Sequence, residues 1–282
     1  MQSEPATRLR GNKMPKRAQC IVFANHKGGT GKTTSCLSIA GFLARSGHKV
    51  LVVDFDPQAN ATSGLGLDGM SLRASMYDAV LDQCEGCEGM PITQVILETN
   101  LENIHAAPSE LDLAVAEVIM QRSRKRTTIL RRILEMVRPF YDYILIDLPP
   151  SSGLLTINGL CAADRMVVAL DPSVFALEAL ENLKKSFHDV RRMARHSIHR
   201  ITAVLVRYVK PDPVSRLLGS RNASQEIEAR LKEMFDPVFI VPDSVEIYRA
   251  QKKGMPISHL APGSRVGKAY RRIAESIATG GE

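Results

Sequence analysis

The chain has 282 residues, of which 44% are hydrophobic, so it can bury a substantial core at a length near the upper limit for one domain. Its formal charge of +7 favours a polyanionic partner without requiring one. No apolar run approaches the roughly 20 residues of a membrane span, and the basic N-terminus has no apolar stretch typical of a secretory signal. Five scattered cysteines do not form a disulfide framework and indicate a reducing cytosol.

Residues 1–18 are polar and basic, which predicts a flexible tail, and from Cys20 onward short runs rich in Val and Ile alternate with helical patterns. The runs predicted as buried strands are Cys20–Asn25, Lys49–Asp54, Tyr143–Asp147, Arg165–Leu170, Ile201–Val206 and Val238–Val241. The predicted helices are Lys32–Ser46, Ser109–Arg138, Gly153–Ala162, Leu177–Arg195, Ala223–Phe235 and Ser264–Ala278. The less regular residues 64–108 are expected to decorate the sheet edge. This alternation predicts an α/β fold, a mostly parallel twisted sheet with helices on both faces, in a single domain over residues 19–282.

A glycine-rich run lies between the first predicted strand and the first predicted helix. The predicted phosphate-binding residues are Gly28, Gly29, Thr30, Gly31, Lys32, Thr33 and Thr34. Glycines allow the backbone to approach a triphosphate closely, and consecutive N–H groups then point at its oxygens. Lys32 is expected to bridge the β- and γ-phosphates, and Thr33 to place its hydroxyl on Mg²⁺. The run therefore predicts a site for a nucleoside triphosphate, and ATP with Mg²⁺ are the expected cofactors.

Acidic residues follow two other predicted strands. Asp54 and Asp56 come after the second strand, and Asp147 ends the third. At the carboxyl ends of parallel strands these side chains face the crevice where such sheets bind ligands, and hard oxygens suit Mg²⁺. Asp54 either supports the metal shell or a switch, or caps the turn that follows it.

One lysine precedes the glycines, where the general pattern would place its first glycine at His26. The run from Lys27 to Thr33 resembles the deviant Walker A family of P-loop ATPases, which includes ParA partition proteins, MinD and the nitrogenase iron protein. By this resemblance Lys27 is a catalytic residue, with Lys32, and reaches the nucleotide of a partner subunit. ATP would then be sandwiched in a homodimer, because a cation supplied in trans neutralises phosphate charge only when two subunits meet.

Two further motifs carry the resemblance, which extends from Cys20 to Ala278. The run Asp-Phe-Asp-Pro-Gln at 54–58 resembles the ParA branch, which implies that Asp56 orients or activates the attacking water. Asp147 looks like the Walker B carboxylate that holds Mg²⁺ through water, with residues 149–152 as the second switch. Pro242 is the candidate for lining the adenine. No arginine finger is evident, so slow turnover is expected.

The resemblance also implies a cycle of function. ParA-like proteins dimerise on ATP, bind double-stranded DNA without sequence preference, and release it after an adaptor protein stimulates hydrolysis. Repeated cycles position a cargo, which is either a DNA partition complex or a protein cluster. The expected protein is cytoplasmic, is associated with the nucleoid when ATP is bound, and has no membrane partner.

DNA contacts require basic side chains that meet phosphates. One basic cluster comprises Arg122, Arg124, Lys125, Arg126, Arg131 and Arg132, and is expected on a long helix. The predicted DNA-binding residues come from a second cluster and are Arg207, Lys210, Arg216, Arg221 and Arg249. A solvated helix face is the alternative for both clusters. Many ParA proteins hold DNA through an arginine directly after the late proline, whereas this chain has Asp243 after Pro242, so either the contact has moved or the surface reads something else.

Three other functions stay open. A MinD-like membrane protein needs a C-terminal amphipathic helix with bulky apolar residues, but residues 270–282 offer only Ile273 and Ile277 beyond alanines and indicate a packed helix. An electron-transfer ATPase needs suitably placed cysteines for an iron–sulfur cluster, whereas Cys84 and Cys87 lie in an acidic, irregular segment. A P-loop ATP-dependent synthetase would need a second substrate motif, which is not evident.

Overall fold

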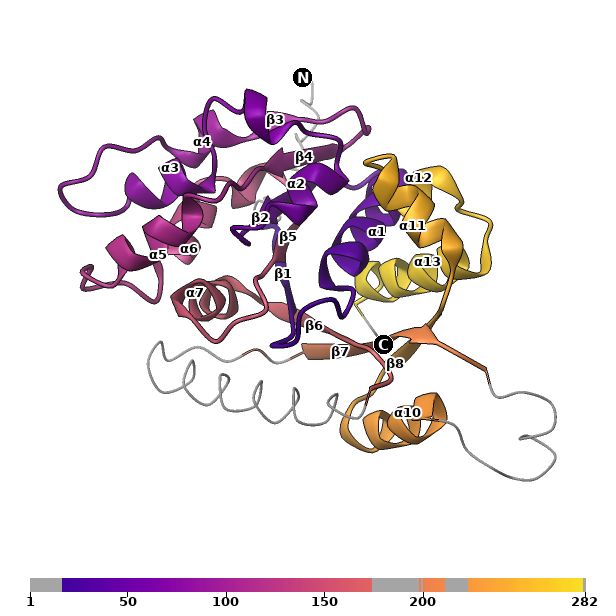
Figure 1. Ribbon diagram of the computed structural model, residues 1–282. Helices are drawn as coiled ribbons and strands as arrows, with labels where there is room; N and C mark the ends of the chain where they lie inside the picture. The colour runs from indigo at the N-terminus through magenta and orange to yellow at the C-terminus, as the bar shows by residue number, and fades with distance from the viewer. Residues whose placement is uncertain (1–16, 174–197, 199, 211–222, 281–282) are drawn as a thin grey trace, which may run out of the picture.

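The computed structural model describes residues 17–173, 198, 200–210 and 223–280. Within these ranges the strands form one sheet in the order β3-β4-β2-β5-β1-β6-β7-β8 (Figure 1). The strands are β1 (Gln19–Ala24), β2 (Val50–Asp54), β3 (Leu97–Glu98), β4 (Ile104–Ala107), β5 (Tyr143–Asp147), β6 (Arg165–Leu170), β7 (Arg200–Tyr208) and β8 (Val238–Pro242). Only the β3–β4 pair is antiparallel among these strands. The carboxyl ends of the parallel strands therefore meet at one edge of the sheet.

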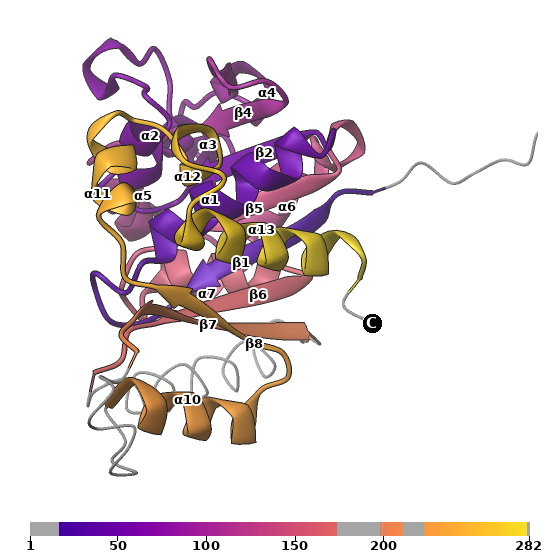
Figure 2. The same ribbon diagram turned by 90° about the vertical axis from the view of Figure 1, so that its right-hand side faces the viewer.

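Helices cover both faces of this sheet (Figures 1 and 2). One face carries α1 (Lys32–Arg45), α2 (Asn60–Gly64), α11 (Val245–Lys252), α12 (Ile257–Leu260) and α13 (Arg265–Ala278). The other carries α3 (Met76–Leu81), α4 (Ile92–Val95), α5 (Leu113–Met120), α6 (Ile129–Glu135), α7 (Leu154–Ala162) and α10 (Ala223–Met234). Two short 3₁₀ helices are η1 (Gly69–Ser71) and η2 (Arg138–Phe140). The predicted fold class, a mostly parallel α/β sheet with helices on both faces, is confirmed.

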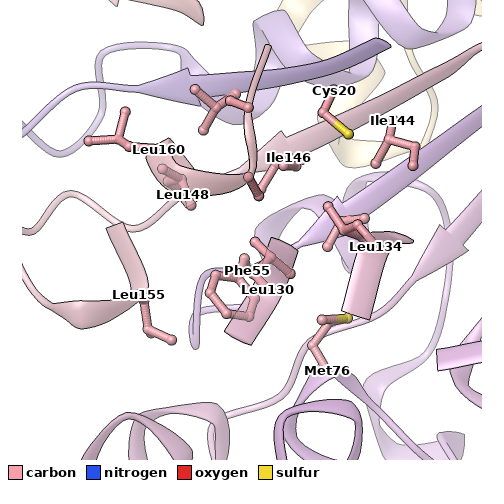
Figure 3. Packing of buried hydrophobic residues seen from close by; sticks show 14 of the residues in the cluster. Cys20, Phe55, Met76, Leu130, Leu134, Ile144, Ile146, Leu148, Leu155 and Leu160 are labelled. Atoms are coloured by element: carbon pink, nitrogen blue, oxygen red, sulfur yellow. The ribbon is translucent and has the colours of Figure 1, made fainter. Parts of the chain in front are cut away.

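The central strands are apolar along their whole length because both of their faces are buried. On β1, Cys20 and Val22 join the core beneath α6 and α7, whereas Ile21 and Phe23 point to the α1 and α13 side. Figure 3 shows the first of these cores, in which Ile144 and Ile146 of β5 lie near the helix residues Leu130 and Leu134. Removing this apolar surface from water is the main force that holds the sheet to its helices.

The expected helix Ser109–Arg138 is wrong as a single element, because α5 and α6 are separated by turns at residues 121–128. Asn158 on α7 explains the break. Its Nδ2 donates to the Arg126 carbonyl at 2.7 Å, and its Oδ1 accepts the Leu130 N–H at 3.1 Å. Asn158 is fully buried, and it forms hydrogen bonds with one carbonyl and one N–H group that would be paired within the helix if the helix were continuous. The basic residues 122–126 therefore lie in turns rather than on a long helix.

The segment 64–108 was expected to decorate the sheet edge. β3 does form that edge, but β4 lies inside the sheet and pairs in parallel with β2. The strand Ile-His-Ala-Ala was missed because it is short and weakly apolar. At the N-terminus, Arg17 and Ala18 do not belong to a free tail, since Arg17 pairs with Glu135 and the Ala18 N–H donates to the Arg138 carbonyl at 3.0 Å. The expected helix Leu177–Arg195 lies outside the described residues.

Candidate nucleotide-binding site

The phosphate loop connects the carboxyl end of β1 to the N-terminus of α1. It lines a cavity of 610 Å³ together with Asp56, Asn60 and Pro150, and all seven predicted residues from Gly28 to Thr34 contribute to its wall. Gly29 and Gly31 have φ angles of 71° and 78°, a left-handed conformation that favours glycine. No side chain caps α1, so the N–H groups of its first turn are available to an anion. The loop thus has the shape and polarity of a phosphate cradle.

Lys32 and Thr33 line this cavity, and the fully buried Asp147 is hydrogen-bonded to Thr33. The Thr33 hydroxyl donates to Asp147 Oδ2 at 2.6 Å, while the other Asp147 oxygen is buried without a hydrogen-bond partner among the described residues. Burial raises the pKa of Asp147, and the charge of Asp54 raises it further. Burial lowers the pKa of Lys32, while the charges of Asp147 and Asp56 oppose this shift. The unpartnered carboxylate oxygen beside a hydroxyl fits a hydrated Mg²⁺ ion.

Asp54 is buried and fully engaged by its neighbours. Its Oδ2 accepts from the Thr62 N–H at 2.7 Å and from the Thr62 hydroxyl at 2.8 Å, and its Oδ1 accepts the Asp56 N–H at 3.3 Å. Burial raises the pKa of Asp54 to about 6, although the bonds from Thr62 lower it. These contacts fix the turn into α2, which favours the capping alternative for Asp54 over metal support.

Asp56, in contrast, lines the phosphate cavity. Its Oδ1 accepts the Gln58 N–H at 3.0 Å, which fixes the carboxylate in the turn after β2. The residue is only 6% exposed, so its oxygens face the cavity rather than bulk water. This is the position that a group orienting a water near the phosphates requires.

Lys27 is not among the residues that line the phosphate cavity. Its Nζ donates to Asp171 Oδ2 at 2.8 Å and to the Ser173 hydroxyl at 2.9 Å, and its N–H donates to Asn25 Oδ1 at 3.1 Å. Sequence reasoning missed Asp171 and Ser173. They follow the carboxyl end of β6, so the rule that located the other carboxylates could have found them.

A second cavity of 210 Å³ adjoins the first on the side of β8 and α11. Pro242 lines it together with Ile247 and Tyr248, which gives a wall suited to a flat apolar ring. Gln251 and Arg207 line both cavities, and Gln251 Nε2 donates to the Thr34 hydroxyl at 2.9 Å. Sequence reasoning missed Gln251, because the chain separation of 217 residues hides its contact with the loop.

Three of the five predicted DNA-binding residues lie in the described part of the chain, and they do not form one surface with a shared role. Arg207 has a φ angle of 53° and lies on the cavity walls, which suits a nucleotide contact better than a DNA contact. Lys210 is exposed just after β7, and Arg249 is exposed on α11 with Lys252 and Lys253. Arg216 and Arg221 lie outside the described residues.

Three observations on the part of the chain that the structure describes concern the electron-transfer and membrane alternatives. No group of three His, Cys, Asp or Glu residues there could hold a metal ion, and Cys84 is buried next to α3. No helix in the same ranges is long and apolar enough to cross a membrane. The residues Ile273 and Ile277 are buried in α13, which confirms that this helix packs on the domain.

The comparison with known proteins agrees with this geometry. A family model described as an AAA domain matches residues 18–200. The sporulation initiation inhibitor protein Soj of Bacillus subtilis is 34% identical, over 93% of this chain and 98% of its own length. This chain belongs to the ParA/Soj family of P-loop ATPases.

A second relative and a solved structure are also similar to this ParA/Soj family member. The chromosome-partitioning ATPase Soj of Treponema pallidum is 35% identical, over 91% of this chain and 96% of its own length. Among solved structures, cobyrinic acid a,c-diamide synthase from Mycobacterium smegmatis is 25% identical with a TM-score of 0.73, and the match covers 93% of this chain and 94% of that chain. That synthase was solved with an ATP analogue and magnesium bound.

Proposed function

We propose that this protein is an ATP-dependent dimerising switch, carried on a single ATPase domain over residues 19–282. In this proposal it binds DNA non-specifically, segregates or positions a cargo, and hydrolyses ATP when an adaptor protein stimulates it. The observation that carries the proposal is the position of Lys27. This lysine belongs to the phosphate loop, yet Asp171 holds its Nζ outside the loop's own cavity. A cation so placed can serve the phosphates of a second copy.

ATP and Mg²⁺ fit the two adjoining cavities. The loop N–H groups and Lys32 would hold the triphosphate, the Thr33 hydroxyl and Asp147 would hold the metal through water, and the adenine would lie against Pro242. When bound, Mg²⁺ neutralises charge on the phosphate oxygens. Arg207 and Gln251, at the junction of the cavities, are placed to contact the ribose or the α-phosphate.

Hydrolysis then depends on positioning rather than on covalent chemistry. Asp56 would orient the attacking water, and Asp54 would hold the Asp56 turn in place through its bonds to Thr62. Turnover is expected to be slow, because Lys27 stays paired with Asp171 until a second subunit supplies a phosphate for it. A turnover near 100 s⁻¹, at the fast end for phosphotransfer enzymes, would contradict a timed switch.

DNA binding is best supported on α11. Arg249, Lys252 and Lys253 are exposed at its C-terminal end, and the hydrogen bond from Gln251 to Thr34 connects the same helix to the phosphate loop. The nucleotide site and the DNA surface would therefore both involve α11. Relatives named for chromosome partitioning favour a DNA partition complex as cargo, and a protein cluster is the other candidate.

The likeness to a diamide synthase supports a second candidate, an ATP-dependent synthetase. Such an enzyme would transfer the γ-phosphate to a small carboxylate before an amine attacks it. Assays for a phosphorylated or amidated product separate this candidate from plain hydrolysis to ADP and phosphate.

The proposed switch is tested with Lys27→Gln in an Asp56→Ala background. We expect Asp56→Ala to keep ATP binding and dimerisation but to lose hydrolysis, so light scattering with Mg-ATP should show a stable dimer. Adding Lys27→Gln should leave the protein monomeric, while a fluorescent ATP analogue still binds to the intact cradle.

A matched control is Lys49→Gln in the same background. Lys49 is exposed and lies at the amino end of β2, on the opposite edge of the sheet. It should dimerise like its parent. The proposal fails if the Lys27 variant dimerises normally, and the role of Asp56 fails if Asp56→Ala is monomeric with ATP.

A further inference from the structure

We propose that the exposed face of α5 is a self-complementary contact, through which two copies of this chain pack their α5 helices antiparallel to each other. The inference rests on the proposed ATP-dependent dimer and names a part of its interface. It is carried by an apolar helix face, by the position of that face, and by the charges at its two ends.

The exposed face of α5 is apolar, which is unusual for a surface helix. Leu111, Val115 and Val118 are 70%, 52% and 60% exposed, and their spacing places them in one stripe. The helix carries a single charged residue, Glu117, whose Oε1 accepts the Leu155 N–H at 3.1 Å. Because its only charge is turned toward α7, the outer face of α5 lacks the polar side chains that normally solvate a helix. A contiguous apolar stripe of this kind indicates an interaction surface.

This stripe lies at the same edge of the sheet as the nucleotide site. β4 runs parallel to β2, so the loop from β4 to α5 starts at the carboxyl edge (Figure 2). The Ser109 N–H donates to the Thr62 hydroxyl at 2.9 Å, which ties this loop to α2. Glu117 ties α5 to the start of α7, just after Pro150 of the cavity wall. A second copy that presents its phosphates to Lys27 approaches this edge.

Charges at the two ends of α5 match a second copy. Asp112 precedes the helix and Arg122 follows it; both are exposed, and neither forms an ion pair with a described residue. When two α5 helices pack antiparallel about the point between Ala116 and Glu117, Val115 lies opposite the partner's Val118. If the helical rise of 1.5 Å per residue is extended to the one or two residues beyond each end of α5, Asp112 and Arg122 lie about 7 and 8 Å from that point, on opposite sides.

Asp112 of each copy therefore lies beside the partner's Arg122. The two-fold axis forms this pair twice, as in any isologous interface. DNA phosphates would not bind the apolar stripe between the charges, whereas an identical helix buries it. The charge pattern therefore favours a second copy of the chain as the partner of this surface.

A charge swap tests the pairing directly. Asp112→Arg places like charges together across the axis, as does Arg122→Asp, and each should weaken Mg-ATP-dependent dimerisation about tenfold or more. The double variant with both changes restores opposite charges and should recover dimerisation to within about threefold of the parent. All are measured by light scattering in the Asp56→Ala background, together with binding of a fluorescent ATP analogue, which should not change.

The apolar stripe is tested with Val115→Lys, which should abolish the dimer. Phe140→Lys is the matched control, because Phe140 is 66% exposed on η2, before the amino end of β5. Normal dimerisation of Val115→Lys, or a double variant as weak as the single ones, would overturn the α5 pairing while the dimer itself stands. If these variants dimerise but, with Asp56 restored, their ATP hydrolysis is no longer stimulated by the adaptor, the face binds the adaptor and the inference is wrong. Failure of the parent to dimerise would instead refute the proposed function.

Discussion

The folded chain gives Lys27 contacts that its sequence motif does not predict. The loop motif identifies it as a cation near phosphates, whereas its pairing with Asp171 and Ser173 is visible only in the folded chain. The Lys27 side chain is 34% exposed, and ion pairs near the surface contribute only about 0–1 kcal/mol. In the proposed dimer, the pair would therefore be exchanged for a triphosphate at little cost. Asp171 would keep the lysine ordered without preventing its release.

Cysteine reactivity is a prediction at the residue scale. Burial raises the pKa of Cys20 to about 12 and that of Cys161 to about 11, and it also raises the pKa of Cys36 and Cys84. Only a thiolate attacks a disulfide reagent, so these thiols should be inert in the native protein. Cys87 is half-buried and should react first.

The measurement is a time course with a chromogenic disulfide reagent at neutral pH. We expect one fast thiol, and the remaining four should react only at the rate of unfolding. A Cys87→Ser variant should lack the fast phase. A fast phase that survives in this variant would show that another cysteine is accessible.

At the scale of elements, the helix α13 depends on a close approach of backbone to backbone. A Cβ added at Gly267 would lie 2.5 Å from the Ala261 carbonyl oxygen and 2.8 Å from that of Pro262. Gly267→Ala should therefore destabilise the protein by about 1–3 kcal/mol, because overpacking outweighs the gain of about 1 kcal/mol in helix propensity.

Gly263, in the loop before α13, provides the control for this substitution. A Cβ there meets no atom within 4 Å, so Gly263→Ala should be neutral or stabilise by about 0.4–1 kcal/mol through the unfolded chain. Urea unfolding measures both variants. Equal stability of the two would mean that the loop before α13 moves freely enough to accept the methyl group.

Elements also show where local sequence patterns stop being informative. The strands β5 and β6 match their predicted bounds, since a fully buried strand is apolar throughout. The division between α5 and α6 was not predicted, because it depends on Asn158, which lies 28 residues beyond Leu130. β4 was missed because its position inside the sheet comes from pairing with β2 rather than from its own composition.

At the scale of the whole molecule, the strand order brings the residues of the candidate site together. β1 lies between β5 and β6, with β2 on the far side of β5. The parallel direction of these strands brings Lys27, Asp56, Asp147 and Asp171 to one edge, although they are far apart in the chain. Helix α11 crosses near the same edge, so a DNA surface on α11 would lie close to the nucleotide (Figure 2).

The proposed DNA surface gives a prediction for the whole molecule. Lys252→Glu with Lys253→Glu should weaken ATP-dependent binding to random duplex DNA. The dependence of log Kd on log salt should flatten by about 0.9 for each DNA phosphate that the variant no longer neutralises. Fluorescence anisotropy over a salt series measures both quantities.

The control for this prediction makes the same charge change on α13. Lys268→Glu with Arg272→Glu reverses two exposed charges on that helix, which is a different element from α11. If both double variants bind DNA equally weakly, net charge rather than a surface on α11 determines binding.

The sequence by itself determined the nucleotide-site class and the fold class, because the phosphate loop is a contiguous motif and each buried strand is apparent from its own residues. It also located Asp56 and Asp147, since carboxyl ends of parallel strands share an edge. Only the tertiary structure decided the ion pair of Lys27, the contact of Gln251 with Thr34, the hydrogen bond from Thr62 to Asp54 and the bond that ties α5 to the start of α7. The physical reason is separation along the chain. Lys27 and Asp171 are 144 residues apart, so folding alone brings them within 2.8 Å.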